Sequence, residues 1–416
     1  MITDASFREA FLHDGYVILP GAVPADRLES LRDAYDVIVA RAREADPDWY
    51  TTATARTDIA PYLDARTAET LVFALEEHTF GVSAGVLGCE ANKVGLTFVS
   101  VLCNPEFEPT ETSPSGQSWG TDPRNWHRDI RPDHNAPLSA LLADEEANGP
   151  GYAQWNIALY DDAILYFIPG SHRRLTSQVE SMQLQSDRGT QTPLPDCVCA
   201  ELKPGDGVVY NNMLLHWGSK YTRRQKRRTI HLGYRTFGRF LPNQRECRLP
   251  EGVREVLPTD SPQRRKLEES FGLFRDEYAL IREILAAVIA GDVARFEAGL
   301  ERLHPSTEGR LRCVILLSKI ARDMCLQSRE KQNKQGSDGG TPTEVDALQQ
   351  HIASRFTAEE LETLWARFGV LDAMVRCGEP IHVNGFLGPP TDYLFEELPS
   401  GLTIDRAVEG MFGENQ

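Results

Sequence analysis

The stretch NWHRDIRP, residues 125–132, places a histidine and an aspartate, His127 and Asp129, two residues apart. A second histidine, His216, comes much later, in GDGVVYNNMLLHWGS, residues 205–219. In a strand, residues i and i+2 point to the same side, so His127 and Asp129 can bind one metal together. Two imidazoles and one carboxylate hold Fe(II) on one face and leave the opposite positions open for a cosubstrate and O2. The pattern predicts a non-haem iron centre with these three residues as metal ligands and catalytic residues.

Each histidine also has a plainer interpretation. His127 taken alone fits an ordinary strand or surface histidine, and His216 fits a core histidine whose hydrogen bonds are satisfied. His216 ends the apolar run Met213-Leu214-Leu215 after a Pro-Gly-Asp turn, a position at a barrel mouth that suits a ligand. Because the third ligand must arrive from a distant strand, the fold has to bring together strands that lie far apart in the sequence.

The strand pattern supports such a fold. Short β runs are expected at 95–103, 124–130, 154–160, 163–168, 196–202, 207–216 and 228–236, with turn signals such as Pro-Gly-Ser and Pro-Gly-Asp-Gly between them. Many short strands with such turns are typical of a jelly-roll or cupin-like barrel. The fold class expected is therefore a mostly β core, a double-stranded β-helix, with flanking helices.

Helices are expected to flank this core on its N-terminal side, at 3–13, 24–45 and 66–80. Two long polar insertions, 104–123 and 131–153, lie on either side of the H-x-D stretch and are rich in proline and glycine. Insertions of that length are usually functional lids or disordered segments. We expect both to close over a substrate, with a solvent-facing decoration as the alternative.

The C-terminal part changes character after about residue 255. Apolar residues recur at helical spacing in 261–286, 281–302, 306–327 and 343–369, while 328–343 contains no apolar residue and predicts a mobile linker. The chain thus divides into an oxygenase-type domain, 1–255, and a helical C-terminal extension, 256–416. The extension carries no recognisable chemistry and is interpreted as a packing element or the contact of a homodimer, with a substrate lid as the alternative.

Composition narrows the class of protein further. The chain of 416 residues carries a formal net charge of -17, so neither nucleic acid nor an anionic membrane surface is expected as a partner. No apolar window is long enough to span a membrane, and the N-terminus lacks the apolar core of a signal peptide. The eight cysteines are scattered, apart from Cys197 and Cys199, and favour reduced thiols over a disulfide or zinc site. A cytoplasmic protein is expected.

A cluster of basic residues in 220–228 requires a choice between neighbouring arginines. A solvated hairpin loop and a nucleic-acid patch are the common interpretations of such a run. Strand parity places Arg227 on one face with Thr229 and His231, and Arg228 on the other face with Ile230 and Leu232. If the apolar face packs outward, Arg227 points at the site, where its guanidinium can grip a carboxylate with two parallel hydrogen bonds. Thr229 can add a hydroxyl, and Arg228 is the second choice.

These residues resemble the phytanoyl-CoA dioxygenase family of iron(II)/2-oxoglutarate oxygenases. The resemblance covers about residues 7–236. It is carried by FREAFLHDGYVILPGAVPADRLESLR at 7–32, WHRD at 126–129, WNIALYDD at 155–162, YFIPGSHRR at 166–174, KPGDGVVYNNMLLHWGS at 203–219 and RRTIHLGYR at 227–235. The segment before Ile164 departs from the family's pattern, and the tail beyond about residue 255 has no counterpart in it.

The resemblance implies a double-stranded β-helix with Fe(II), 2-oxoglutarate and O2 as cofactor and cosubstrates. It implies that His127, Asp129 and His216 bind the metal, that Arg227 binds the far carboxylate of 2-oxoglutarate, and that Trp155 lies near the cosubstrate. The expected activity is hydroxylation of a small molecule with release of succinate and CO2, and Asp129 argues against halogenation. Two alternatives stay open: a non-oxidative cupin-like metal-containing binding protein, and an oxygenase acting on a macromolecule.

Overall fold

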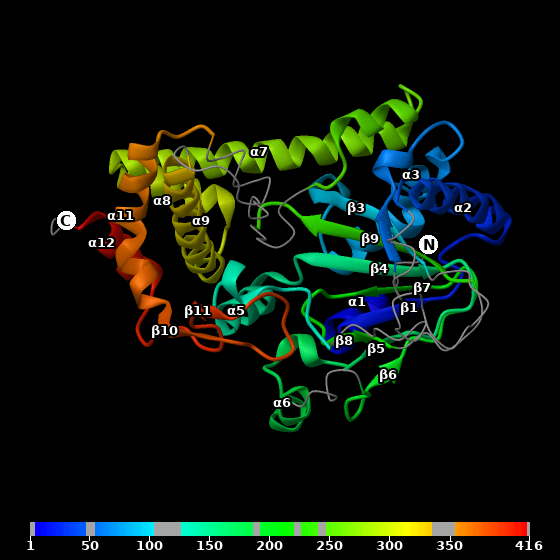
Figure 1. The fold of residues 1–416 in the computed structure, drawn as a ribbon, viewed down its shortest axis with the longest axis horizontal. Helices are drawn as coiled ribbons and strands as arrows, with labels where there is room; N and C mark the ends of the chain where they lie inside the picture. Colours follow the sequence, from blue (N-terminus) through cyan, green and yellow to red (C-terminus); the bar gives the residue numbers. More distant parts are fainter. Residues whose placement is uncertain are drawn as a thin grey trace.

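The computed structural model describes residues 5–46, 55–103, 126–185, 192–219, 226–239, 247–334 and 354–413. Its centre consists of two antiparallel sheets (Figure 1). The six-stranded sheet has the order β1 (Tyr16–Leu19), β7 (Gly207–Tyr210), β4 (Tyr152–Ala158), β9 (Arg228–Thr236), β3 (Val94–Cys103) and β2 (Ala55–Asp58). The three-stranded sheet has the order β6 (Val198–Cys199), β5 (Leu165–Phe167) and β8 (His216–Gly218). The two sheets agree with the expected β core, and the winding of a double-stranded β-helix stays a prediction.

N-terminal helices cover the outer face of the six-stranded sheet. They are α1 (Ala5–Asp14), α2 (Leu28–Ala45), α3 (Ala68–Ala74) and α4 (Val82–Leu87). Leu31, Tyr35 and Ile38 recur on one side of α2, the spacing that the sequence shows, and they join one buried cluster with Ile230 and Leu232 of β9. Burial of this face fixes which side of β9 points outward, and the opposite side must therefore face the space between the sheets.

Two of the expected strands are wrong in detail. The stretch 124–130 is described from residue 126, and its His127 and Arg128 form isolated bridges rather than a strand of either sheet. The run 207–216 divides into β7 and the start of β8, because a turn at Asn211 interrupts it. The Asn211 side-chain oxygen accepts a hydrogen bond of 2.8 Å from the Met213 amide, which stabilises the turn. This turn carries the chain from one sheet to the other.

The expectation that 131–153 forms a loop is also wrong. The segment forms a 3-10 turn, η6 (Pro132–His134), then helix α5 (Leu138–Asn148) and the start of β4. Leu138 and Leu141 stand one helical turn apart and are both buried, so this segment has an apolar face despite its prolines and glycines. The other expected insertion, 104–123, lies outside the described residues.

The C-terminal region is helical, as expected. It contains α7 (Pro262–Ala290), α8 (Val293–Leu303), α9 (Thr307–Lys334), α11 (Ala358–Met374), a hairpin of β10 (Arg376–Ile381) and β11 (Thr391–Tyr393), and α12 (Ile404–Phe412). The expected linker at 328–343 begins too early, because 328–334 continues α9, and 335–343 lies outside the described residues. Within the described parts of the chain, no helix is both long and apolar enough to cross a membrane.

The C-terminal helices pack on the β core rather than standing apart from it. Ala136, just before α5, and Ala140, within it, belong to the same buried cluster as apolar residues of α7, α8, α9 and α11. Helix α7 crosses the upper edge of the molecule from the β3 end to the C-terminal helices (Figure 1). These contacts agree with the packing interpretation of the extension, while the domain boundary at 255 and the homodimer contact stay predictions.

Candidate metal centre

A cavity of about 100 Å³ lies between the two sheets. Both sheets contribute to its walls, together with the H-x-D segment and the residue preceding β9. The lining residues are Arg56, Leu102, His127, Asp129, Gln154, Asn156, Ile164, Leu165, Tyr210, His216, Gly218, Arg227 and His231. The cavity thus brings the three expected metal ligands and the expected anchoring arginine to one place.

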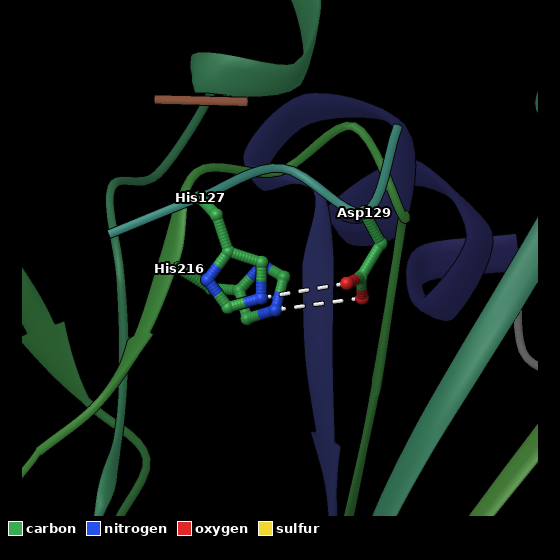
Figure 2. Close-up of side chains that lie close together, drawn as sticks. All are labelled: His127, Asp129 and His216. Atoms are coloured by element: carbon green, nitrogen blue, oxygen red, sulfur yellow. Dashed lines mark ion pairs between the residues drawn. The ribbon is translucent and has the colours of Figure 1, made fainter. Parts of the chain in front are cut away.

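His127, Asp129 and His216 point toward one another at this cavity (Figure 2). The His127 Nε2 atom lies 3.4 Å from one Asp129 carboxylate oxygen, and the His216 Nε2 atom lies 3.5 Å from the other. One ligand atom of each residue lies within 4.8 Å of the other two. Two ligand atoms about 2.1 Å from a metal, at right angles to each other, are about 3 Å apart. The spacing therefore fits three ligands on one face of a single ion.

Backbone hydrogen bonds place the ligands. His127 and His216 exchange both of their amide–carbonyl bonds, at 2.9 and 3.0 Å, so they sit directly opposite each other. The Asp129 amide donates to the Asn212 carbonyl at 2.8 Å, which puts Asp129 on the same edge two residues along. The i, i+2 spacing predicted this common side correctly, although the pairing consists of bridges rather than a long strand.

The ring of His216 is oriented by its own backbone. Its Nδ1 atom donates to the Leu214 carbonyl at 2.8 Å, because a carbonyl oxygen can only accept. The proton is thereby held on Nδ1, and Nε2 presents its lone pair to the cavity. Metal-binding histidines commonly donate their other ring N–H to a carbonyl in this way.

Gln154 holds the carboxylate of Asp129. Its amide nitrogen donates to Asp129 at 2.7 Å and to the Tyr210 hydroxyl at 2.6 Å. Burial works to raise the pKa of Asp129, but the two facing histidines and the Gln154 amide outweigh it and hold the pKa well below its usual range. Asp129 is therefore ionised, as a metal ligand has to be.

Arg227 is buried beside the cavity and is held by a carboxylate. Its Nε atom donates to Asp162 at 2.8 Å, and both side chains are about 5% exposed. The Thr229 hydroxyl donates to the same Asp162 oxygen at 2.6 Å. Thr229 thus lies on the expected face, but Asp162 takes up its hydroxyl, and Thr229 is not among the residues that line the cavity.

The two arginines lie on opposite faces, as strand parity predicted, and Arg227 is the one that lines the cavity. Arg228 points away from the cavity, and its Nε atom donates to Asp36 of α2 at 2.9 Å. The expectation for Trp155 is wrong. Its neighbours Gln154 and Asn156 line the cavity, so Trp155 faces the helices, where its indole nitrogen donates to Ser83 at 2.8 Å.

Several cavity residues were not anticipated from the sequence. Gln154, Asn156, Tyr210 and His231 follow from strand alternation once the inward face is known. Asp162, which binds Arg227 beside the cavity, had no such signal. His231 is fixed by contacts of its Nδ1 atom with the Trp155 carbonyl, at 2.9 Å, and the Asn156 side chain, at 2.7 Å. These residues hold the walls of the cavity in place around the three ligands.

Replacing Gln154 with alanine is expected to weaken divalent-metal binding about 10- to 100-fold, the usual cost of losing an outer-shell partner. The physical reason is that Asp129 loses the amide that orients it. Calorimetric titration with Co(II), a stable substitute for Fe(II), measures the effect. Trp155→Phe is the matched control, since it alters the outward face of the same strand. Unchanged affinity in Gln154→Ala would contradict this role.

Some solved structures are similar to this chain at low sequence identity. Similar solved structures include AviO1 from Streptomyces viridochromogenes Tue57, with 18% identity over 56% of this chain and 96% of that one (TM-score 0.39). Another is EctD from S. alaskensis with 2-oxoglutarate and 5-hydroxyectoine, with 18% identity over 58% and 79% (TM-score 0.40). A third is the epimerase SnoN in complex with Fe3+, alpha ketoglutarate and nogalamycin RO, with 15% identity over 62% and 92% (TM-score 0.39).

The sequence itself has no match among curated proteins. A family model described as phytanoyl-CoA dioxygenase (PhyH) matches residues 11–229, more than half of the 416 residues. That range includes His127, Asp129, His216 and Arg227. The chain therefore belongs to the phytanoyl-CoA dioxygenase family of iron(II)- and 2-oxoglutarate-dependent oxygenases.

Proposed function

We propose that this protein hydroxylates a C–H bond of a small molecule, with 2-oxoglutarate and O2 as cosubstrates. The observation that carries the proposal is the convergence of a His-Asp-His cluster and a buried arginine in one cavity. A protein that used its metal only structurally would have no need for a buried cation lining the same cavity. The arginine therefore favours an oxygenase over a cupin-like binding protein.

The residues of the chain divide the work between holding the metal and holding the cosubstrate. His127, Asp129 and His216 would hold Fe(II) from one face. Arg227 would bind the distal carboxylate of 2-oxoglutarate, while Asp162 keeps its guanidinium in place. When bound, iron and 2-oxoglutarate supply the activation of O2, with release of succinate and CO2.

The walls of the cavity support a small molecule as the substrate. Leu102, Ile164 and Leu165 contribute apolar surface that restricts water near the metal. The support for a macromolecular substrate was the basic run at 220–228. In the part of that run that the structure describes, Lys226 and Arg228 both bind Asp36, and Arg227 binds Asp162. These cations face carboxylates of the same chain.

The test is stoichiometric detection of succinate from 2-oxoglutarate under Fe(II) and air, with and without a library of small metabolites. A substrate is expected to stimulate succinate formation and to gain the mass of one oxygen atom. Asp129→Ala serves as the inactive control. A stimulating compound that loses two hydrogens or is isomerised would replace hydroxylation with desaturation or epimerisation. Metal binding without any 2-oxoglutarate turnover would favour the binding protein.

A further inference from the structure

The metal-binding segment 127–130 is held on two edges by different parts of the chain. Its odd-numbered residues bond to the 212–216 segment, as described for His127 and Asp129. Its even-numbered residues bond to the C-terminal hairpin connection: the Arg128 amide donates to the Gly385 carbonyl at 2.9 Å, and the Leu387 amide donates to the Ile130 carbonyl at 3.1 Å. The backbone that carries Asp129 is thus enclosed between the β core and the C-terminal region.

The side chain of Arg128 strengthens this second edge. It is fully buried, and its guanidinium lies 4.8 Å from the centre of the Phe386 ring. Its nitrogens donate to the Thr176 hydroxyl at 2.9 Å and to the Ser171 carbonyl at 3.2 Å. Arg128 therefore ties the metal segment to the turn after β5 and to Phe386 at once.

Phe386 is itself firmly packed. It is 8% exposed, and its ring meets Phe395 edge-to-face at 4.8 Å. Ile130 and Met213, one from each segment that carries the ligands, belong to the same buried cluster as Phe386. Loss of this ring would leave a cavity beside Ile130 and remove the aromatic face beneath Arg128.

A second contact holds the chain just beyond the metal segment. Lys319 of α9 is buried, and its ammonium donates to the Pro132 carbonyl at 3.0 Å and to the Asn135 carbonyl. The same ammonium lies 3.9 Å from the centre of the Tyr393 ring in β11. Burial lowers the pKa of Lys319 to about 7, and nearby carboxylates, led by Asp133, oppose that effect. The buried amino group of Lys319 thereby holds the turn η6 against α9.

We propose that the C-terminal region is a working part of the metal site, with Phe386 and Lys319 as positioning residues for Asp129. The region braces the ligand segment from the side opposite the β core, so that the carboxylate meets the two histidines at the spacing one ion requires. This proposal rests on the metal site proposed above. It assigns the C-terminal extension neither to dimerisation nor to a lid but to the scaffold that orients the ligands.

The test compares Co(II) affinity and the visible spectrum of the Co(II) protein in Phe386→Ala, Lys319→Met and the wild-type chain. Both variants are expected to bind Co(II) about 10- to 100-fold more weakly, the range for lost outer-shell support, with an altered spectrum that reports a changed ligand geometry. Phe386→Tyr keeps the ring over Arg128 and is expected to restore both readouts.

Phe296→Ala is the matched control. Phe296 is fully buried among the C-terminal helices, so its loss lowers stability without touching the metal segment. Thermal melts confirm that each variant is folded at the titration temperature. Equal Co(II) affinity in Phe386→Ala and wild type would overturn the proposal, as would an equal loss in Phe296→Ala. Wild-type protein that binds Co(II) but never consumes 2-oxoglutarate would overturn only the proposed function, since the positioning is read from metal binding.

Discussion

His216→Ala is expected to abolish 2-oxoglutarate turnover and to reduce Fe(II) binding below detection. The variant removes one of three ligands, so its loss should exceed the roughly 10- to 100-fold cost of an outer-shell change. His127 and Asp129 would be left as two ligands on one side of the ion. Anaerobic Fe(II) titration followed by a succinate assay measures both effects.

A cavity histidine outside the cluster provides the control for this loss. His231 lines the same cavity, and its Nδ1 atom contacts the Trp155 carbonyl and the Asn156 side chain. His231→Asn is expected to retain metal binding at close to the wild-type affinity. If His216→Ala turned over normally, or if His231→Asn lost metal as completely, the ligand assignment would be wrong.

Arg227→Ala is expected to raise the apparent KM for 2-oxoglutarate about 10- to 100-fold while leaving Co(II) affinity nearly unchanged. The reason is the loss of a charge-assisted hydrogen bond to a carboxylate, about 1.5–3 kcal/mol, where each 1.4 kcal/mol is tenfold. Asp162 would also lose its cationic partner in a buried position, so a lower Tm is expected. Succinate formation as a function of 2-oxoglutarate concentration gives the KM.

A variant of the neighbouring Arg228 separates cosubstrate binding from a contribution to stability. Arg228 is 3% exposed and binds Asp36 on the outer side of β9, so Arg228→Ala should lower the Tm with little change in the 2-oxoglutarate requirement. Arg227→Lys is expected to recover only part of the affinity, because an ammonium lacks the planar fork of the guanidinium. A KM effect confined to Arg228→Ala would mean that the inner and outer faces of the strand had been exchanged.

The common side of His127 and Asp129 and the choice between the arginines could be predicted because both depend on local periodicity, whereas His216 was assigned from its place after an apolar run and from the family resemblance. Side chains alternate in extended backbone, so the common side of His127 and Asp129 follows from their spacing alone, even where the segment forms only bridges. The same alternation separated Arg227 from Arg228. Alternation along β4 also places Trp155 outward if Gln154 and Asn156 are taken as the inward residues. The expectation for Trp155 came instead from the family resemblance.

The remaining features depend on partners far away in the sequence. The stretch 131–153 suggests a loop because prolines and glycines occur near both of its ends, yet Leu138 and Leu141 form an apolar helix face that packs with Phe386 and Phe395 from the C-terminal region. The role of Asp162 depends on where β9 lies, and that of Phe386 on a hairpin at the other end of the chain. Asp162 lies far from Arg227 in the sequence, and Phe386 lies far from Arg128, so no local sequence pattern could reveal either contact.

The two-edged pairing of the metal segment also sets an order of events during synthesis. A chain leaves the ribosome from its N-terminus, and domains fold as their parts become available. All three ligands exist once residue 216 has been made, but the brace at Gly385–Leu387 follows only after α7, α8, α9 and α11. During that interval the ligand segment is held by the β core alone. We therefore expect tight iron binding only after the C-terminal region has been synthesised and has packed against this segment.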